Sequence, residues 1–207
     1  MRISKITAAG VMAIVGLGLA GMPKADAAYI AYLYQDGSNV VGTGSGSLNL
    51  AALTLSGTDI TDATAALEAD EAMLALGPIA AGAGIDYYLG ISGPASYGSG
   101  SEFFAESGSS GNIIIISQDV TIGVPTGYTS GDALGTSTDT WDNTTLAALG
   151  VTDGTYTWTW GTGLNADSFI LHVGEAPGAT GVPEPASLAL FGTAVAALGL
   201  SRRRRAW

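Results

Sequence analysis

Few side chains in this 207-residue chain are of the types that carry out catalysis. The sequence has one histidine and no cysteine, so disulfides, thiol catalysis and thiolate metal sites are excluded. A Ser-His-Asp triad would need His172, but this residue lies in the alternating segment FILHV and no G-x-S-x-G elbow occurs. Carboxylates are plentiful, yet no spacing selects two of them as a glycosidase acid pair. We therefore expect a protein that is not an enzyme and has no catalytic residues.

Charge is distributed unevenly along the chain. Of the 18 acidic residues only Asp26 and Glu184 lie outside residues 28–181, which leaves 16 within that segment. The same segment has no lysine or arginine, so its fold must rest on apolar burial and hydrogen bonds. Nucleic-acid phosphates are bound through basic residues, which excludes nucleic acid as a partner. The seven basic residues all lie near the two ends: Arg2, Lys5, Lys24, Arg202, Arg203, Arg204 and Arg205.

One acid-rich stretch, SGDALGTSTDTWDN, contains residue types that could hold Ca²⁺. Asp132, Asp139 and Asp142 would supply carboxylates and the glycine-rich backbone would supply carbonyls. Neither an EF-hand loop nor a G-G-x-G-x-D repeat is present, and a solvated acidic surface is the ordinary explanation. We expect no cofactor, with Ca²⁺ as the alternative, and the identity of any metal stays unknown at this point.

Aromatic side chains are the remaining candidates for binding. Alternation in TYTWTW places Tyr156, Trp158 and Trp160 on one face of a strand, where they could stack on sugar rings or line a sandwich core. Trp141 is expected in a loop before a short helix, which makes it the better exposed candidate. The residues proposed for glycan contact are therefore Trp141, Trp158 and Trp160.

Glycine punctuates short runs of β-branched and aromatic residues throughout the body, where 25 of the 31 glycines lie. This pattern predicts one all-β domain, a sandwich or jelly roll, with one or two short helices. The apolar run NIIIIS predicts a strand covered on both faces or at the centre of the sandwich, and SFILHV is expected to return as the hairpin partner of TYTWTW. The expected strands are YIAYLY from Tyr29, SLNLAALTL from Ser47, DYYLGIS from Asp86, EFFAES from Glu102, NIIIIS from Asn112, TYTWTW from Thr155 and SFILHV from Ser168.

Two segments carry helix start and stop signals. Asp62 could cap a helix over residues 63–76, which a Gly-Pro pair would end, although three closely spaced acids within it repel one another. The segment WDNTTLAALG could begin at Asp142 or Asn143 and form one or two turns through Leu146–Leu149.

Two glycine patterns resemble nucleotide-binding loops only superficially. The G-x-G-x-x-G at Gly16, Gly18 and Gly21 has no strand before it and lies in the amino-terminal apolar segment. The glycines at positions 42, 44 and 46 are not followed by lysine, and we expect them to form a flexible turn into a strand.

The first 27 residues have the composition of a secretory signal peptide. Basic residues precede an apolar run from Ala8 to Leu19, and Ala25 and Ala27 form a small-residue cleavage site. We expect export through the secretion translocon and cleavage by signal peptidase after Ala27. The mature body, residues 28–181, should be an extracellular β-sandwich domain.

The last 26 residues, 182–207, combine a proline break, an apolar stretch and a basic end. The break, which would interrupt any helix or strand, consists of Val182, Pro183, Glu184 and Pro185. Residues 186–201 carry no charge, and as a helix these 16 residues span about 24 Å, slightly less than the roughly 30 Å hydrocarbon core. We therefore expect a transmembrane helix over 186–201. Its carboxyl end is expected on the cytoplasmic side of the membrane, because it is followed by the cluster Arg202, Arg203, Arg204 and Arg205.

The order V-P-E-P, apolar helix and arginine cluster in Val182–Arg205 resembles the PEP-CTERM sorting signal of Gram-negative bacteria. The resemblance implies recognition by a membrane-embedded exosortase and cleavage near Pro183–Pro185. It also implies transient anchoring in the inner membrane and release to the cell surface or the extracellular matrix, often one rich in exopolysaccharide or biofilm. Segments such as YYLGISGPASYGSG are similar to poorly characterised extracellular domains that carry this signal, and they bring no catalytic residues with them. We expect a structural or adhesive surface protein, with a carbohydrate-binding module as the alternative.

Overall fold

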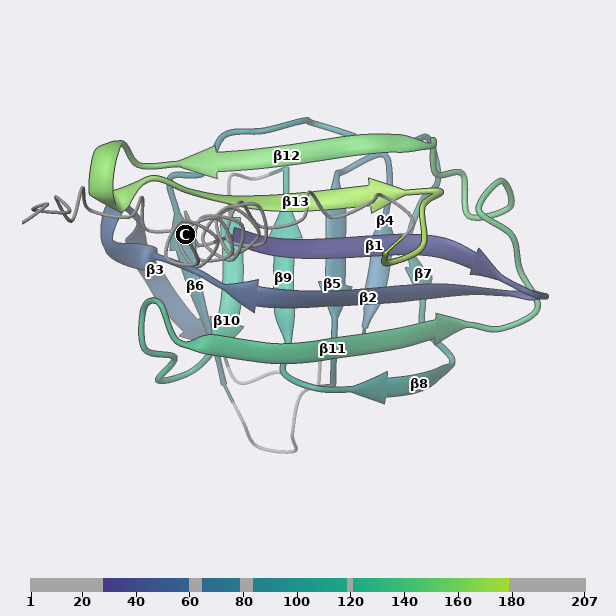
Figure 1. Cartoon of the computed structure of the whole chain (residues 1–207), viewed down its shortest axis with the longest axis horizontal. Coiled ribbons are helices and arrows are strands. Elements are labelled where there is room, and N and C mark those ends of the chain that lie inside the picture. Colours follow the sequence, from purple (N-terminus) through teal and green to yellow (C-terminus); the bar gives the residue numbers. More distant parts are fainter. Residues whose placement is uncertain (1–27, 60–64, 79–83, 119–120, 179–207) are drawn as a thin grey trace, which may run out of the picture.

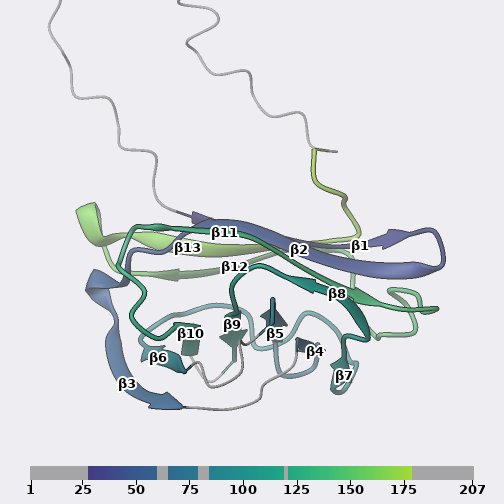
Figure 2. The same ribbon diagram turned by 90° about the horizontal axis from the view of Figure 1, so that it is seen from below.

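The alternating β-branched and aromatic runs form two β-sheets in the computed structural model, which describes residues 28–59, 65–78, 84–118 and 121–178. The two sheets lie face to face, and the strands of one run crosswise to those of the other (Figure 1). Seen edge-on, they make two layers (Figure 2). The expected all-β sandwich is therefore confirmed for the described residues, with the sheets packed in the orthogonal manner.

The first sheet joins the two ends of the body. Strand β1 pairs in parallel with β13 and antiparallel with β2, so the first and last strands lie side by side at its centre. The strands β12 and β13 form the antiparallel hairpin expected from TYTWTW and SFILHV. In sheet order the six strands are β12 (Gly154–Trp160), β13 (Asp167–Val173), β1 (Ala28–Asp36), β2 (Asn39–Ser47), β11 (Ala133–Trp141) and β8 (Ser107–Ser110).

The second sheet is built from shorter strands, all paired antiparallel. At its centre is β9, from the apolar run NIIIIS. Ile114 and Ile116 are buried in the main core, while Ile115 on the opposite face is only partly buried against a second cluster that includes Ala75 and Ile85. The strand is therefore covered fully on one face and partly on the other. In sheet order the strands are β3 (Thr54–Asp59), β6 (Ile85–Leu89), β10 (Thr121–Pro125), β9 (Ile114–Ser117), β5 (Met73–Leu76), β4 (Ala66–Glu68) and β7 (Phe103–Phe104).

The core lies between the sheets and is rich in aromatic residues. Phe169 stacks on Tyr29, with ring centroids 5.4 Å apart, and meets Trp158 edge-on at 5.7 Å. All three side chains are buried, as are Leu171 and Leu74 from the facing sheets. Interdigitation of this kind supplies the apolar burial that a body without lysine or arginine requires.

The helix expected over residues 63–76 is wrong where the structure describes it. Residues 66–68 and 73–76 form the antiparallel hairpin β4–β5, and Asp62 lies outside the described residues. Leu67, Leu74 and Leu76 are fully buried in this arrangement. The acids that would crowd one another along a helix instead gather at a turn in which Asp70 and Glu71 are exposed and Ala72, which is buried, takes a left-handed conformation with φ 48°.

Three smaller expectations also need correction. Residues 142–150 form turns rather than a helix, closed by the N–H of Leu149 donating to the carbonyl of Thr145 at 3.0 Å. The segment expected as one strand from Ser47 contains a short 3-10 helix, Leu50–Ala52, before β3. EFFAES is divided between sheets, since β7 belongs to the second sheet and β8, which begins at Ser107, to the first.

The glycine triplet expected to form a turn is part of strand β2. Gly42 and Gly44 face the core, where their lack of a side chain leaves room for large neighbours. A Cβ on Gly44 would lie 2.5 Å from the Tyr29 ring, and one on Gly42 would lie 2.9 Å from Trp141. Glycine is thus needed for close packing of aromatic residues, which the sequence pattern alone did not indicate.

Hydrogen bonds of β11 reach strand β8 of the same sheet through Ser109 and the end of β5 in the second sheet through Gly77. Both carboxylate oxygens of Asp139, which is fully buried, accept bonds: Oδ1 from the hydroxyl of Ser109 at 2.5 Å and Oδ2 from the N–H of Gly77 at 2.6 Å. Nearby, Ser137 donates to the carbonyl of Asn112 at 2.6 Å. Satisfied polar groups of this kind fix how one sheet sits on the other.

Candidate functional site

His172 lies on the outer face of β13, partly exposed, and contacts three side chains. Its ring stacks on Tyr32 at 5.0 Å, its Nδ1 lies 3.0 Å from the hydroxyl of Thr155, and the same nitrogen lies 3.8 Å from Glu175. In a catalytic triad the nucleophile and the carboxylate hold opposite ring nitrogens. Both groups here approach Nδ1, so this arrangement is not a proton relay.

An outward row of aromatic and hydroxyl side chains crosses the six-stranded sheet around His172. The strand registers place Thr155, His172, Tyr32, Thr43 and Thr138 next to one another on successive strands. The hydroxyls of Thr43 and Thr138 lie 3.3 Å apart. Because adjacent residues of a strand face opposite sides, this row is the reverse of the apolar core face.

The three tryptophans proposed for glycan contact are buried. Trp141, Trp158 and Trp160 are 2%, 1% and 4% exposed. Trp141 ends strand β11, so its expected position in an exposed loop is wrong. The indole N–H groups of Trp141 and Trp160 donate to the carbonyls of Phe103 and Asn49, at 3.1 and 2.7 Å. All three side chains therefore serve the core and present no ring face to a glycan.

The stretch proposed as a Ca²⁺ loop is strand β11. Asp132 precedes the strand and Asp142 follows it, which separates them by roughly 30 Å at the usual rise per residue. Asp139 lies between them and points inward, where its two carboxylate oxygens accept hydrogen bonds from Ser109 and Gly77. These three carboxylates cannot converge on one ion. Among the described residues, no group of three metal-ligating side chains forms a site.

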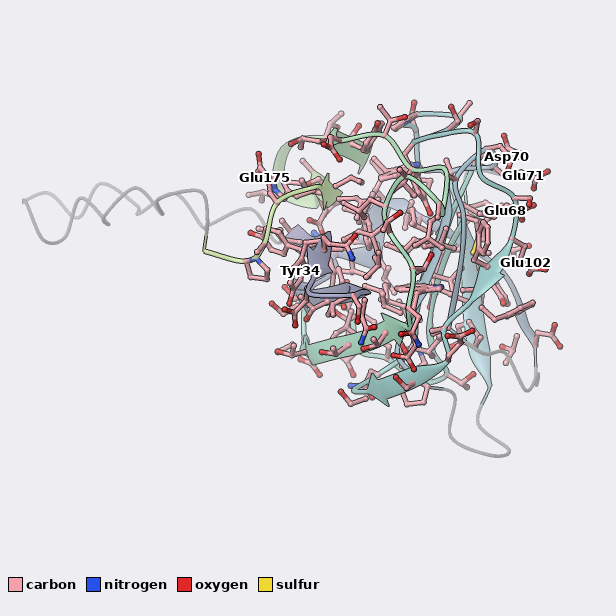
Figure 3. The ribbon with its side chains drawn as sticks, turned by 90° about the vertical axis from the view of Figure 1, so that its right-hand side faces the viewer. Tyr34, Glu68, Asp70, Glu71, Glu102 and Glu175 are labelled. Carbon is pink, nitrogen blue, oxygen red and sulfur yellow. The ribbon has the colours of Figure 1, made fainter. Side chains whose placement is uncertain are left out.

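Acidic residues gather at one end of the seven-stranded sheet. Glu68, Asp70, Glu71 and Glu102 lie on the same side of the molecule, opposite Tyr34 and Glu175 (Figure 3). Desolvation raises the pKa of Glu68, and the carboxylates of Glu71, Asp70 and Glu102 raise it further. No lysine or arginine in the body can offset this repulsion.

Asp86 on β6 differs from Glu68 in that its surroundings lower the pKa of its carboxyl group. Its Oδ1 accepts a hydrogen bond from the hydroxyl of Thr58 at 2.6 Å and another from Thr126 at 3.2 Å, while Oδ2 accepts from the N–H of Gly127. These bonds, led by that of Thr58, lower the pKa of Asp86 against the effect of burial. The carboxylate thereby links three neighbouring segments of the sheet.

Sequence reasoning missed the partly exposed residues Tyr32, Tyr34, Phe103 and Phe104. Alternation in YIAYLY is a signal that could have indicated Tyr32 and Tyr34, since it places them opposite the buried residues of the same strand. The exposure of Phe103 and Phe104 follows from their position in a two-residue edge strand, which requires knowledge of the sheet order.

Comparison with known families matches residues 181–205 to the PEP-CTERM protein-sorting motif. Neither the curated proteins nor the solved structures contain a match to this chain. The chain thus carries the sorting signal that Val182–Arg205 resembled, which implies export, a membrane-anchored sorting step by an exosortase and arrival at the cell surface.

The structure does not describe the two ends of the chain, on which the sorting predictions fall. The helix expected over 186–201 lies outside the described residues, and so do Ala25 and Ala27 of the signal peptide. Within the described part of the chain, none of the helices is long and apolar enough to cross a bilayer. The residues of the sorting motif and its arginine cluster that also lie outside the described part are Val182, Pro183, Glu184, Pro185, Arg202, Arg203, Arg204 and Arg205.

Proposed function

We propose that the protein is a non-enzymatic, structural or adhesive component of the cell surface or of an exopolysaccharide-rich extracellular matrix. The observation that carries this proposal is the sorting motif at 181–205, which directly follows a sandwich without lysine or arginine. Such a body remains soluble through self-repulsion and attracts cations from the surrounding medium.

The setting of the most reactive side chain supports the same proposal. The imidazole of His172 packs against Tyr32 and shares one nitrogen with Thr155 and Glu175, which leaves it without the geometry of a general base in a triad. The large aromatic residues Trp158 and Trp160 are used for packing. The protein is better suited to rigidity than to turnover.

Complementation of a strain lacking the protein tests this role. We expect the full chain and its His172→Ala variant to restore surface labelling and matrix mass equally, and a chain truncated after Gly181 to be secreted without restoring either. Loss of matrix mass in the His172→Ala strain, with surface labelling and retention on isolated exopolysaccharide both intact, would indicate catalysis instead.

A second candidate, glycan binding, is favoured by the outward row on the six-stranded sheet. Tyr32 in this row, and Tyr34 two residues further along the same face of β1, are only partly buried, and the threonine hydroxyls of the row could bond to sugars. We expect Tyr34→Ala to weaken the retention of the exported protein on isolated exopolysaccharide. Leu164→Ala is the control, because Leu164 is 92% exposed and lies away from this row, in the 3-10 helix Gly163–Asn165. Equal retention of the two variants would remove this candidate.

A further inference from the structure

A small pocket lies between β7, at the edge of the seven-stranded sheet, and the end of β11. Its volume is about 190 Å³. Trp141 and Leu149, both buried, form its inner wall, and Phe103 and Phe104 form its exposed wall. Cavities for drug-sized ligands are larger, about 300–1,000 Å³, so this one fits a single small group.

The exposed wall is held in place by backbone contacts. The carbonyl of Phe103 accepts the indole N–H of Trp141 at 3.1 Å, and β7 pairs with β4. The next residue, Ala105, donates to the carbonyl of Ala65 at 2.8 Å. Despite this anchoring Phe103 is 36% and Phe104 55% exposed, so both residues remain accessible to solvent beside the cavity that they line. A ligand that covered them would gain apolar contact area.

The polar side of the pocket carries negative charge. Glu106, Asp142 and Thr144 complete its lining. The Glu106 carboxylate accepts the backbone N–H of Asp142 at 3.1 Å, which ties it to another residue of the pocket lining. No lysine or arginine occurs between residues 28 and 181, so no basic side chain of the body neutralises these two acids.

Aromatic residues beside carboxylates favour an organic cation over a metal ion. Ca²⁺ takes six to eight oxygen ligands, whereas much of this lining is carbon. An alkylammonium group combines positive charge with an apolar surface and is attracted by the faces of aromatic rings. We propose that this pocket binds a small organic ammonium group, held by Phe103, Phe104 and Glu106. The proposal concerns this pocket alone. It does not depend on the sorting signal or on glycan binding by the outward row of the six-stranded sheet.

Titration of the exported, ¹⁵N-labelled protein with tetramethylammonium chloride tests this proposal. The readout is the indole N–H resonance of Trp141, which lies in the pocket wall. We expect a saturable shift with a dissociation constant on the order of millimolar. Sodium chloride at equal ionic strength and tert-butanol, a neutral molecule of similar shape, should produce no saturable shift. A similar saturable shift with tert-butanol, or none with tetramethylammonium, would overturn the proposal.

Matched variants locate the binding. Phe104→Ala and Glu106→Gln should each weaken tetramethylammonium binding at least about threefold, and glutamine keeps the acceptor for the Asp142 N–H. Leu55→Ala is the control for Phe104, because it removes a side chain of similar exposure, 53%, from the opposite edge strand β3. Glu175→Gln is the control for Glu106. Unchanged affinity in the first two variants, with the native amide spectrum preserved, would contradict the assignment.

Discussion

The two faces of the six-stranded sheet are made by the same strands and differ in almost every property. On the inner face Tyr29, Trp158 and Phe169 pack against one another and are buried. On the outer face Tyr32 and His172 stack beside threonine hydroxyls and remain partly exposed. Alternation along each strand is sufficient to produce this contrast.

The contrast shows that aromatic content does not indicate a binding surface. The tryptophans, which are the strongest stacking residues, all belong to the inner face or its margin within the described residues. Burial also raises the pKa of the inner Tyr29 to about 12. Only residues on the outer face of the sheet are therefore available for contact with a ligand there.

The largest expected effect of a single change is on the inner face. Trp158→Ala should lower the free energy of unfolding by about 3–5 kcal/mol, because it leaves a cavity beside Phe169. His172→Ala, on the outer face of the neighbouring strand, should cost less than about 1 kcal/mol. Urea denaturation followed by circular dichroism measures both. Similar losses in the two variants would contradict the distinction between the faces.

Addition of one methyl group to the inner face should also be destabilising. Gly44→Ala would place a Cβ 2.5 Å from the Tyr29 ring and should cost about 1–3 kcal/mol. Gly57→Ala is the matched control, since no atom lies within 4 Å of its added Cβ in the exposed strand β3. The control should be neutral or slightly stabilising in the same denaturation experiment. An equally stable Gly44→Ala protein would show that the Tyr29 packing is not close.

Asp139 is the charged exception on the inner face and should reverse the usual effect of pH. Burial raises its pKa in the folded state, although the bonds from Ser109 and Gly77 act in the opposite direction. Its favourable contribution is therefore present below the unfolded pKa and is lost as pH rises through the folded pKa. As pH rises from about 4 to about 7, the free energy of unfolding of Asp139→Asn should therefore increase relative to that of the parent. The test is the urea midpoint across that range, and an unchanged difference at all pH values would exclude this role.

Asp86, near the surface of the other sheet, should show the opposite and smaller dependence. Hydrogen bonds from Thr58, Gly127 and Thr126 lower its folded pKa, so its contribution is present above the unfolded pKa and is lost as pH falls through the folded pKa. Asp86→Asn should therefore be less stable than the parent at pH 7 and approach it in acid. Chemical denaturation at pH 7 and in acid measures the stability of each variant relative to the parent. If both assignments hold, this difference changes with pH in opposite directions for Asp86→Asn and Asp139→Asn.

Much of the first sheet could be predicted from the sequence, because its strands alternate. TYTWTW and SFILHV pair as expected, and YIAYLY forms most of β1. Strand β2 was missed because Gly42, Gly44 and Gly46 resemble a turn unless their neighbours in space are known, which are aromatic side chains at Gly42 and Gly44 and the backbone of β1 at Gly46. The hairpin β4–β5 was missed because its alanine-rich sequence favours a helix, and tertiary burial of Leu67 and Leu74 overrides that propensity.

The candidate sites were harder to predict than the strands. The chemical type of Trp141 suggested a contact residue, but its burial depends on Gly42 and on β7, which are distant in sequence. The pocket at Phe103 combines residues from an edge strand and from a turn about 40 positions later. The local sequence pattern contains no information about contacts between segments that are distant in sequence. The sorting motif was recognised directly because its residues are contiguous.

The tail that follows the sandwich is, in our interpretation, a sorting signal that an exosortase removes by cleavage. Intact-mass spectrometry of the protein from a host with an exosortase, and from the same host without it, tests this claim most directly. We predict that only the exosortase-bearing host yields a protein that ends near Pro183–Pro185 and lacks the mass of the residues up to Trp207. A full-length tail in both hosts would contradict the account and would make the segment a permanent part of the protein.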